Sequence, residues 1–147
     1  MRRLFIDGDA CPVKDIVIKV GGLRQLEVVI VASFSHYSTK ELPQHVSIQY
    51  VDAGADAADY RLVALLVKGD ILITQDYGLA ALALPKGVRV LHHTGYEYTA
   101  DKIDVMLESR YFNAKVRKSG KRTKGPKKLT ELDKKVFHEL LVQVLSE

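Results

Sequence analysis

The sequence has one cysteine, no tryptophan and no apolar run long enough to cross a membrane. A single cysteine, Cys11, excludes an internal disulfide bond and a zinc site built from several cysteines. The longest apolar runs, Val28–Ala32 and Leu62–Val67, are far shorter than the roughly 20 residues that a bilayer requires. The first apolar run ends at Asp7, which is too early for the core of a signal peptide. We therefore expect a cytoplasmic protein with no membrane segment.

The composition is that of an ordinary globular domain, but its charge is unevenly distributed. Of 147 residues, 47% are hydrophobic and 27% are charged, which favours a single domain over residues 1–147. The net charge of +4 conceals a basic segment, residues 110–128, which contains no acid and which we call the strap. Its nine basic residues are Arg110, Lys115, Arg117, Lys118, Lys121, Arg122, Lys124, Lys127 and Lys128. The rest of the chain carries 13 basic and 18 acidic side chains, a net charge of −5.

Short runs rich in Val, Ile and Leu alternate with segments of helical periodicity. The predicted strands are Leu4–Ile6, Glu27–Ala32, Ser47–Tyr50, Ile71–Thr74 and Arg89–Leu91. The predicted helices are Pro12–Leu23, Ala57–Val67, Tyr77–Ala83, one from Thr99 or Asp101 to about Ser109, and one over residues 130–145, capped by Thr130 and Asp133. This alternation predicts an α/β fold with a mainly parallel central sheet, followed by the strap and a C-terminal helix.

Acidic residues follow three of the predicted strands. Asp7 and Asp9 come after the first, Asp52, Asp56 and Asp59 come after the third, and Asp76 comes after the fourth. Ligands of open α/β sheets bind beyond the carboxyl ends of the strands, so these acids are expected at one edge. Carboxylates held close together repel one another unless a cation joins them, and oxygen ligands suit a hard divalent ion. The expected cofactor is Mg²⁺ or Mn²⁺.

Each acid also has a structural interpretation. Asp56 and Asp59 have the positions of a helix cap and a first-turn acid, which the helix dipole favours without a metal. The sequence Asp7-Gly8-Asp9 is good turn chemistry, and Pro12 suits a first helical position. The feature that favours a ligand site is the carboxylate of Asp7 directly after a buried strand, where desolvation has to be compensated.

Basic and aromatic residues predict contacts to a polyanion. Lys14, in the first turn of a predicted helix, opposes the helix dipole and therefore suits an anion such as phosphate, although an exposed lysine explains it equally well. Arg117, Lys121, Arg122 and Lys124 of the strap are expected to bind successive phosphates of a polyanion. Near its start the strap contains two aromatic residues, Tyr111 and Phe112. They either stack on unpaired bases or pack the strap against the rest of the protein.

Three further residues near the same edge have simpler explanations. A helix N-terminus would lower the pKa of the Cys11 thiol, but neighbouring carboxylates would raise it. A cysteine-phosphatase loop has an arginine six residues after its cysteine, whereas this chain has Val17 there. We interpret Cys11 as a small buried residue. His92 and His93 end the fifth predicted strand; they could touch a substrate, although exposed surface histidines are the simpler account.

Four motifs, IDGDACPVK, GADAAD, GDILITQDYGLAA and RKSGKRTKGP, resemble the YaiI/YqxD family of bacterial proteins, assigned to the PIN-like superfamily. The resemblance covers about Leu4 to Leu145 and implies a three-layer α/β/α sandwich. It also implies metal-dependent cleavage of RNA. The acids of the superfamily pattern fall on Asp7 with its neighbour Asp9, on Asp56 and Asp59, and on Asp76.

Three other functions fit part of the sequence. The stretch FIDGD also resembles the opening of haloacid-dehalogenase-type phosphatases. Those enzymes place a second acidic motif just after a later strand, whereas Gly69-Asp70 precedes the strand here. The lysine motif of those enzymes is also missing at the expected strand end. A two-component receiver domain would use Asp52 as phosphoacceptor, but it needs a lysine after the fifth strand. The third is a non-catalytic RNA-binding module in which the acids are structural and the strap binds.

The working hypothesis, which the resemblance implies, is that the chain is a nuclease, a hydrolase that cleaves RNA. One or two Mg²⁺ or Mn²⁺ ions would activate water for attack on a phosphodiester. The expected metal-binding and catalytic residues are Asp7, Asp9, Asp56, Asp59 and Asp76. The expected substrate-binding residues are Lys14, Arg117, Lys121, Arg122 and Lys124.

Overall fold

The computed structural model describes residues 2–52, 54, 56–108 and 128–147. Most of the strap lies outside this part of the chain, so the predictions made there are not tested by the structure. They concern Tyr111, Phe112, Arg117, Lys121, Arg122 and Lys124.

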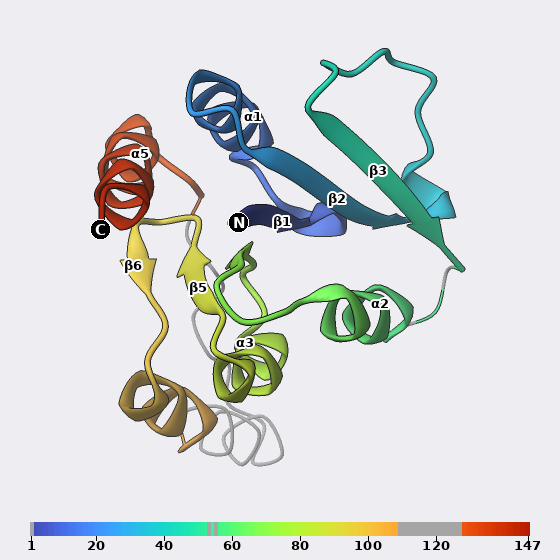
Figure 1. Cartoon of the computed structure of the whole chain (residues 1–147). Helices are drawn as coiled ribbons and strands as arrows, with labels where there is room; N and C mark the ends of the chain where they lie inside the picture. The colour runs from blue at the N-terminus through green and yellow to red at the C-terminus, as the bar shows by residue number, and fades with distance from the viewer. Residues whose placement is uncertain (1, 53, 55, 109–127) are drawn as a thin grey trace.

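Six strands form one mixed sheet (Figure 1). The strands are β1 (Arg3–Asp7), β2 (Glu27–Ser33), β3 (Val46–Val51), β4 (Ile71–Ile73), β5 (Arg89–His92) and β6 (Tyr96–Glu97). Their order is β3-β2-β1-β4-β5-β6, and every pairing is parallel except that of β5 with the short β6. The predicted α/β class with a mainly parallel sheet is therefore confirmed.

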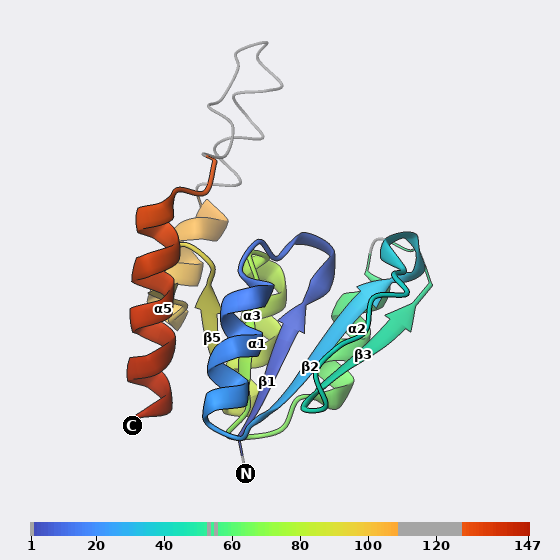
Figure 2. The ribbon, with the colours of Figure 1, turned by 90° about the horizontal axis from the view of Figure 1, so that it is seen from above.

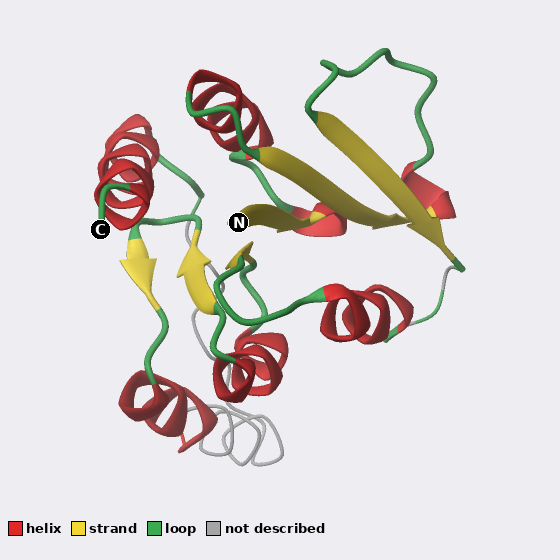
Figure 3. Cartoon of the chain, in the orientation of Figure 1, coloured by secondary structure: helices red, strands yellow, loops and turns green. Residues whose placement is uncertain are grey.

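Helices cover both faces of the sheet (Figures 1 and 3). The α-helices are α1 (Lys14–Leu23), α2 (Ala57–Leu65), α3 (Tyr77–Ala83), a helical segment at 100–108, and α5 (Glu131–Leu145). Three short 3₁₀ turns add to these: η1 (Gly8–Ala10), η2 (Phe34–His36) and η3 (Leu84–Lys86). α1 and α5 lie on one face, and α2 and α3 lie on the other, which gives the expected three-layer sandwich. Within the described residues, none of the helices is long and apolar enough to span a membrane.

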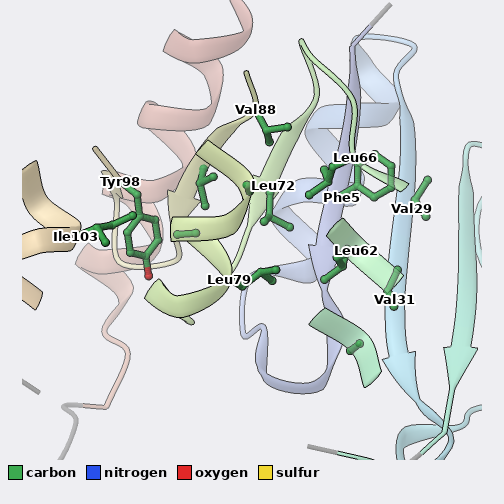
Figure 4. Close-up of a cluster of buried hydrophobic side chains, with 14 of the residues drawn as sticks. Phe5, Val29, Val31, Leu62, Leu66, Leu72, Leu79, Val88, Tyr98 and Ile103 are labelled. Carbon is green, nitrogen blue, oxygen red and sulfur yellow. The ribbon is translucent and has the colours of Figure 1, made fainter. Parts of the chain in front are cut away.

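The two faces of the sheet carry separate cores because side chains alternate along each strand. In β1, Phe5 points into a core with α2 and α3 that includes Leu62, Leu72 and Leu79 (Figure 4). Its neighbours Leu4 and Ile6 point to the opposite core, which includes Phe137 of α5. β1 is thus buried on both sides, as expected of a central parallel strand.

The predicted strands match the structure to within one residue at either end, and the larger differences are at the ends of two helices. Helix α1 begins at Lys14 rather than Pro12, because the chain first makes the η1 turn and then extends at Cys11. Helix α2 ends at Leu65 rather than Val67: Leu66 is extended, and the Val67 amide donates to the side chain of Asp70. Strand β6 was not predicted.

The strand order reverses between β1 and β4, the position at which open α/β sheets form a ligand-binding crevice. We call the region at the carboxyl ends of these two strands the crevice. From β1 the chain builds β2 and β3 on one side, then crosses over to build β4 and β5 on the other. A reversal of this kind separates the loops at the carboxyl ends of the two central strands and is where open α/β sheets bind ligands. Figure 2 shows β1, β2, β3 and β5 pointing toward the same edge. The order also argues against a receiver domain, because in that fold β1 lies beside β3.

Candidate functional site

Two of the predicted acids lie at the crevice. Asp7 is the last residue of β1, and Asp76 follows β4. Thr74, which is buried, connects them: its hydroxyl donates to Asp7 Oδ2 at 2.9 Å and accepts from the Asp76 amide at 3.0 Å. Thr74 was not among the sequence candidates, although its place at the end of a predicted strand could have indicated it.

The environment of Asp7 opposes its negative charge. Burial raises the pKa of this carboxyl, and the nearby charges of Asp76 and Asp9 raise it further. The Thr74 hydrogen bond and the positive charge of Lys14 lower the pKa, but they do not cancel the effect of burial. The fold therefore holds at the end of β1 a carboxylate that a cation would stabilise.

Asp59 brings a third carboxyl group to the same place from the first turn of α2. Burial, followed by the charges of Asp76, Asp7 and Asp56, raises the pKa of Asp59 to about 6. A hydrogen bond between the Asp59 and Asp76 carboxyl groups also raises it, because Asp59 must be protonated to donate. Side chains from β1, α2 and the β4–α3 loop thus converge, as the sequence predicted for this edge.

The other two predicted acids are less central. Asp56 is at the N-cap position of α2, but its exposed side chain makes no capping hydrogen bond. Asp9 lies in η1 and bonds toward β2. Its Oδ1 accepts from the Ser33 amide at 2.8 Å and from the Ser33 hydroxyl at 3.2 Å. Both still contribute negative charge, since Asp56 raises the pKa of Asp59 and Asp9 that of Asp7.

Asp76 also has a structural role, which its sequence position alone did not predict. Its Oδ1 accepts from the amides of Gly78 at 2.8 Å and Leu79 at 3.3 Å and so caps α3. A side chain with this bond satisfies a helix N-terminus without any ligand. The cap also fixes the Asp76 carboxyl group in place beside Asp7 and Asp59.

The donor set fits Mg²⁺ or Mn²⁺ in its chemistry but not as a complete cage. Among the described residues, no three His, Cys, Asp or Glu side chains are grouped as ligands of one metal ion. Mg²⁺ is typically held by one or two carboxylates, with water and substrate phosphate completing its shell. Asp7, Asp59 and Asp76 supply hard oxygen donors whose mutual repulsion such an ion would relieve.

The remaining candidates near this edge do not supply a nucleophile. Burial raises the pKa of the half-buried Cys11 to about 11, so it remains a thiol at neutral pH. His92 and His93 are half-buried, so both rings keep part of their surface accessible. Their rings stack at 4.3 Å, and His92 also stacks on Tyr96 at 4.5 Å. Burial, together with the neighbouring His93 charge, lowers the pKa of His92 to about 4.

Asp70, at the opposite end of β4, is structural. Its side chain is fully buried and accepts from the Arg3 guanidinium at 2.9 and 3.3 Å and from the Val67 amide at 2.9 Å. The Gly69-Asp70 pair therefore lies away from the crevice, as its position before the strand predicted. It cannot supply the second acidic motif of a haloacid-dehalogenase-type site.

Comparison with known proteins gives a consistent family match. The family model described as "Uncharacterized BCR, YaiI/YqxD family" matches residues 5–147. A UPF0178 protein of Oceanobacillus iheyensis is 58% identical over 145 residues, 99% of each chain. A UPF0178 protein of Enterococcus faecalis is 54% identical over 97% of each chain. A UPF0178 protein of Bacillus cereus is also 54% identical, over 98% of this chain and 99% of the relative. No solved structure gives a significant match.

Proposed function

Because the chain belongs to the YaiI/YqxD family, which is described as uncharacterized, we propose its function from its site. The proposed activity is metal-dependent hydrolysis of RNA phosphodiester bonds, as in PIN-like nucleases. The observation that carries the proposal is the convergence of Asp7, Asp59 and Asp76 at the crevice between β1 and β4. Three separate elements bring together carboxyl groups whose charges repel one another, and a bound divalent ion would relieve that repulsion.

Each residue of the site has a role in this proposal. Carboxylates of Asp7, Asp59 and Asp76 would hold the divalent ion together with water and substrate phosphate, and Thr74 orients Asp7 through its hydroxyl. A bound ion would supply charge neutralisation and activation of water for attack on phosphorus. Lys14, close enough to lower the pKa of Asp7, binds a nonbridging phosphate oxygen. The strap adds positive charge for the RNA backbone.

The test is cleavage of end-labelled single-stranded RNA by the purified protein with Mn²⁺, with Mg²⁺ and with EDTA. We expect cleavage with either ion and none with EDTA. Asp7→Asn and Asp76→Asn should each reduce the rate by at least about 100-fold, since a metal-site carboxylate is removed. The matched control is Glu139→Gln, an exposed carboxylate of α5, which should cleave as the native chain does. Cleavage that survives EDTA or both Asp variants would overturn the proposal.

One observation favours a non-catalytic RNA-binding module instead. Asp76 already caps α3, so its carboxyl group has a role in the fold without chemistry. RNA that is retained but not cut, with equal affinity in EDTA and in Mn²⁺, would support the binding module. Hydrolysis of small phosphate esters without cleavage of RNA would instead support the phosphatase alternative.

A further inference from the structure

Exposed aromatic rings gather beside the acidic site. Among the described residues, the aromatic side chains that are largely exposed are Phe34 (55%), Tyr37 (62%) and Tyr60 (72%). Phe34 and Tyr37 come from η2 and the residue after it, and Tyr60 comes from α2. Exposed aromatic rings are costly in water, so their concentration in one region indicates a binding surface.

Tyr50, near the end of β3, connects the rings. Its ring stacks on Phe34 with centroids 5.7 Å apart and an interplanar angle of 21°, and it contacts Tyr37 at 5.0 Å. The Ser38 amide donates to the Tyr50 hydroxyl at 3.2 Å, which fixes the chain that follows η2. Phe34 and Tyr37 thus pack against the Tyr50 ring and expose their outer surfaces to solvent.

A cleft of about 420 Å³ adjoins these rings. Phe34 and Tyr50 line one side, and Tyr60 and Arg61 of α2 line the other. The α2 residues that line it are spaced as one helix face: Ala57, Tyr60, Arg61, Ala64 and Leu65. Of the described residues that line the cleft, one is acidic, Asp52, and one is basic, Arg61. The anionic backbone of a nucleic acid would therefore lie nearer Arg61. We call Phe34, Tyr37, Tyr50, Tyr60 and Arg61 the aromatic face.

Covalent neighbours join the aromatic face to the acidic site on two sides. Phe34 follows Ser33, whose amide and hydroxyl donate to Asp9. Tyr60 and Arg61 follow Asp59 in the chain, and the Asp59 carboxyl group forms a hydrogen bond with the carboxyl group of Asp76. A strand of nucleic acid lying across the crevice would therefore meet the rings next to the carboxyl groups.

We propose that the aromatic face binds unpaired nucleobases of single-stranded RNA and positions the adjoining phosphate at the acidic site. The inference rests on the proposed function, for which it names the substrate class. Aromatic rings stack on any base, and an arginine beside them adds a cation for the backbone. Bases in a duplex are already stacked on one another, so the aromatic face selects single strands.

The experiment uses Phe34→Trp in the full chain, in EDTA so that binding is separated from cleavage. The native sequence has no tryptophan, so the introduced indole is the only one and reports directly on stacking. We expect its fluorescence to be quenched by a short oligoadenylate. The same strand annealed to its complement should quench it much less. Affinity for the single strand should equal or exceed that of the native chain.

Three variants test whether the ring itself binds. Phe34→Leu keeps an apolar side chain against Tyr50 but lacks the aromatic ring, and Tyr37→Ala removes the second exposed ring. Each should weaken binding of single-stranded RNA by about fivefold to 150-fold, the range for loss of one base stack. Leu23→Ala is the matched control: Leu23 is 77% exposed at the far end of α1 and should bind as the native chain does.

The outcomes separate this inference from the proposed function. Native affinity in Phe34→Leu and Tyr37→Ala, or unquenched indole fluorescence, overturns the aromatic face even if Mn²⁺-dependent cleavage continues. Ring-dependent binding of single strands without cleavage in Mn²⁺ supports the aromatic face and overturns the nuclease. Self-association that depends on Phe34, with no binding of RNA, would make the rings a contact between protein chains and would also overturn the inference.

Discussion

The carboxyl group of Asp59 titrates near neutrality, because burial and three neighbouring carboxyl groups oppose its charge. Its pKa rises from 3.8 in the unfolded chain to about 6 in the folded one. The folded state binds the proton more tightly, so the free energy of unfolding falls as the pH rises from 3.8 to about 6. Ionised Asp59 therefore destabilises the metal-free protein at neutral pH.

We expect Asp59→Asn to stabilise the metal-free chain at pH 7.5 and to give no gain at pH 4. Because Asp59 keeps partial contact with water, the gain is discounted to about 1 kcal/mol, or about 2–4 °C in melting temperature. Thermal unfolding followed by circular dichroism in EDTA measures it. Asp56→Asn, an exposed neighbour, is the control and should gain less. Equal destabilisation by Asp59→Asn at both pH values would contradict the account.

Asp70 is the opposite case, an acid that the fold needs for stability. Asp70→Asn breaks the ion pair between a fully buried carboxylate and the partly exposed Arg3, and it weakens the bond from the Val67 amide. We expect a loss of about 1.5–3 kcal/mol in the free energy of unfolding, measured by urea denaturation. RNA cleavage, measured at a temperature where the variant is folded, should not change, because Asp70 lies at the far end of β4. A loss of cleavage in the folded variant would place Asp70 in the site.

Most elements could be predicted from their hydrophobic patterns. The five parallel strands and α3 match their predicted ranges within two residues at either end, because buried strands read as apolar runs. The capping box of Thr130 and Asp133 correctly marked the start of α5. Strand β6 was missed because two residues give no periodicity; its pairing depends on the turn at Gly95, where φ is +102°.

The placement of the acids at one edge followed from the parallel sheet, but their individual roles did not. Convergence of Asp7 and Asp76 needs only that β1 and β4 be neighbours, which the strand-end rule anticipates. Asp59 joins them because α2 begins at the same edge. The capping bonds of Asp76 and the bond from Ser33 to Asp9 depend on loop geometry that no periodicity encodes. The aromatic face was missed because its rings come from η2, β3 and α2, which meet only in the folded chain.

The turn between β5 and β6 packs directly against α5. A Cβ atom on Gly95 would lie 2.9 Å from the Phe137 amide nitrogen and would also clash with the side chain of Val136. Because the positive φ is also strained for alanine, we expect Gly95→Ala to lower the free energy of unfolding by about 3 kcal/mol or more. Urea denaturation measures it. Gly54→Ala is the control, since its Cβ would meet nothing closer than 3.9 Å; similar losses in both variants would contradict the packing argument.

The whole molecule combines an acidic body with a basic strap. Outside residues 110–128 the net charge is −5, so under the proposed function the attraction for RNA has to come chiefly from the strap. Replacing Lys121, Arg122 and Lys124 together by glutamine should reduce the slope of log affinity for single-stranded RNA against log salt by about 2. Neutralising three exposed lysines of the body, Lys19, Lys68 and Lys135, is the control and should leave the slope nearly unchanged. An unchanged slope in the strap variant would assign the strap to another role.

The central claim is that the carboxyl groups at the crevice hold a divalent ion. Titration of the protein with Mn²⁺, followed by the electron paramagnetic resonance signal of the free ion, tests it most directly and does not depend on a substrate. The native chain should bind one or two ions at pH 7.5. Asp59→Asn and Asp76→Asn should each weaken binding at least about tenfold, whereas Glu139→Gln should not. A native chain that leaves the free Mn²⁺ signal unchanged, or Asp variants that bind as tightly as the native chain, would contradict the claim.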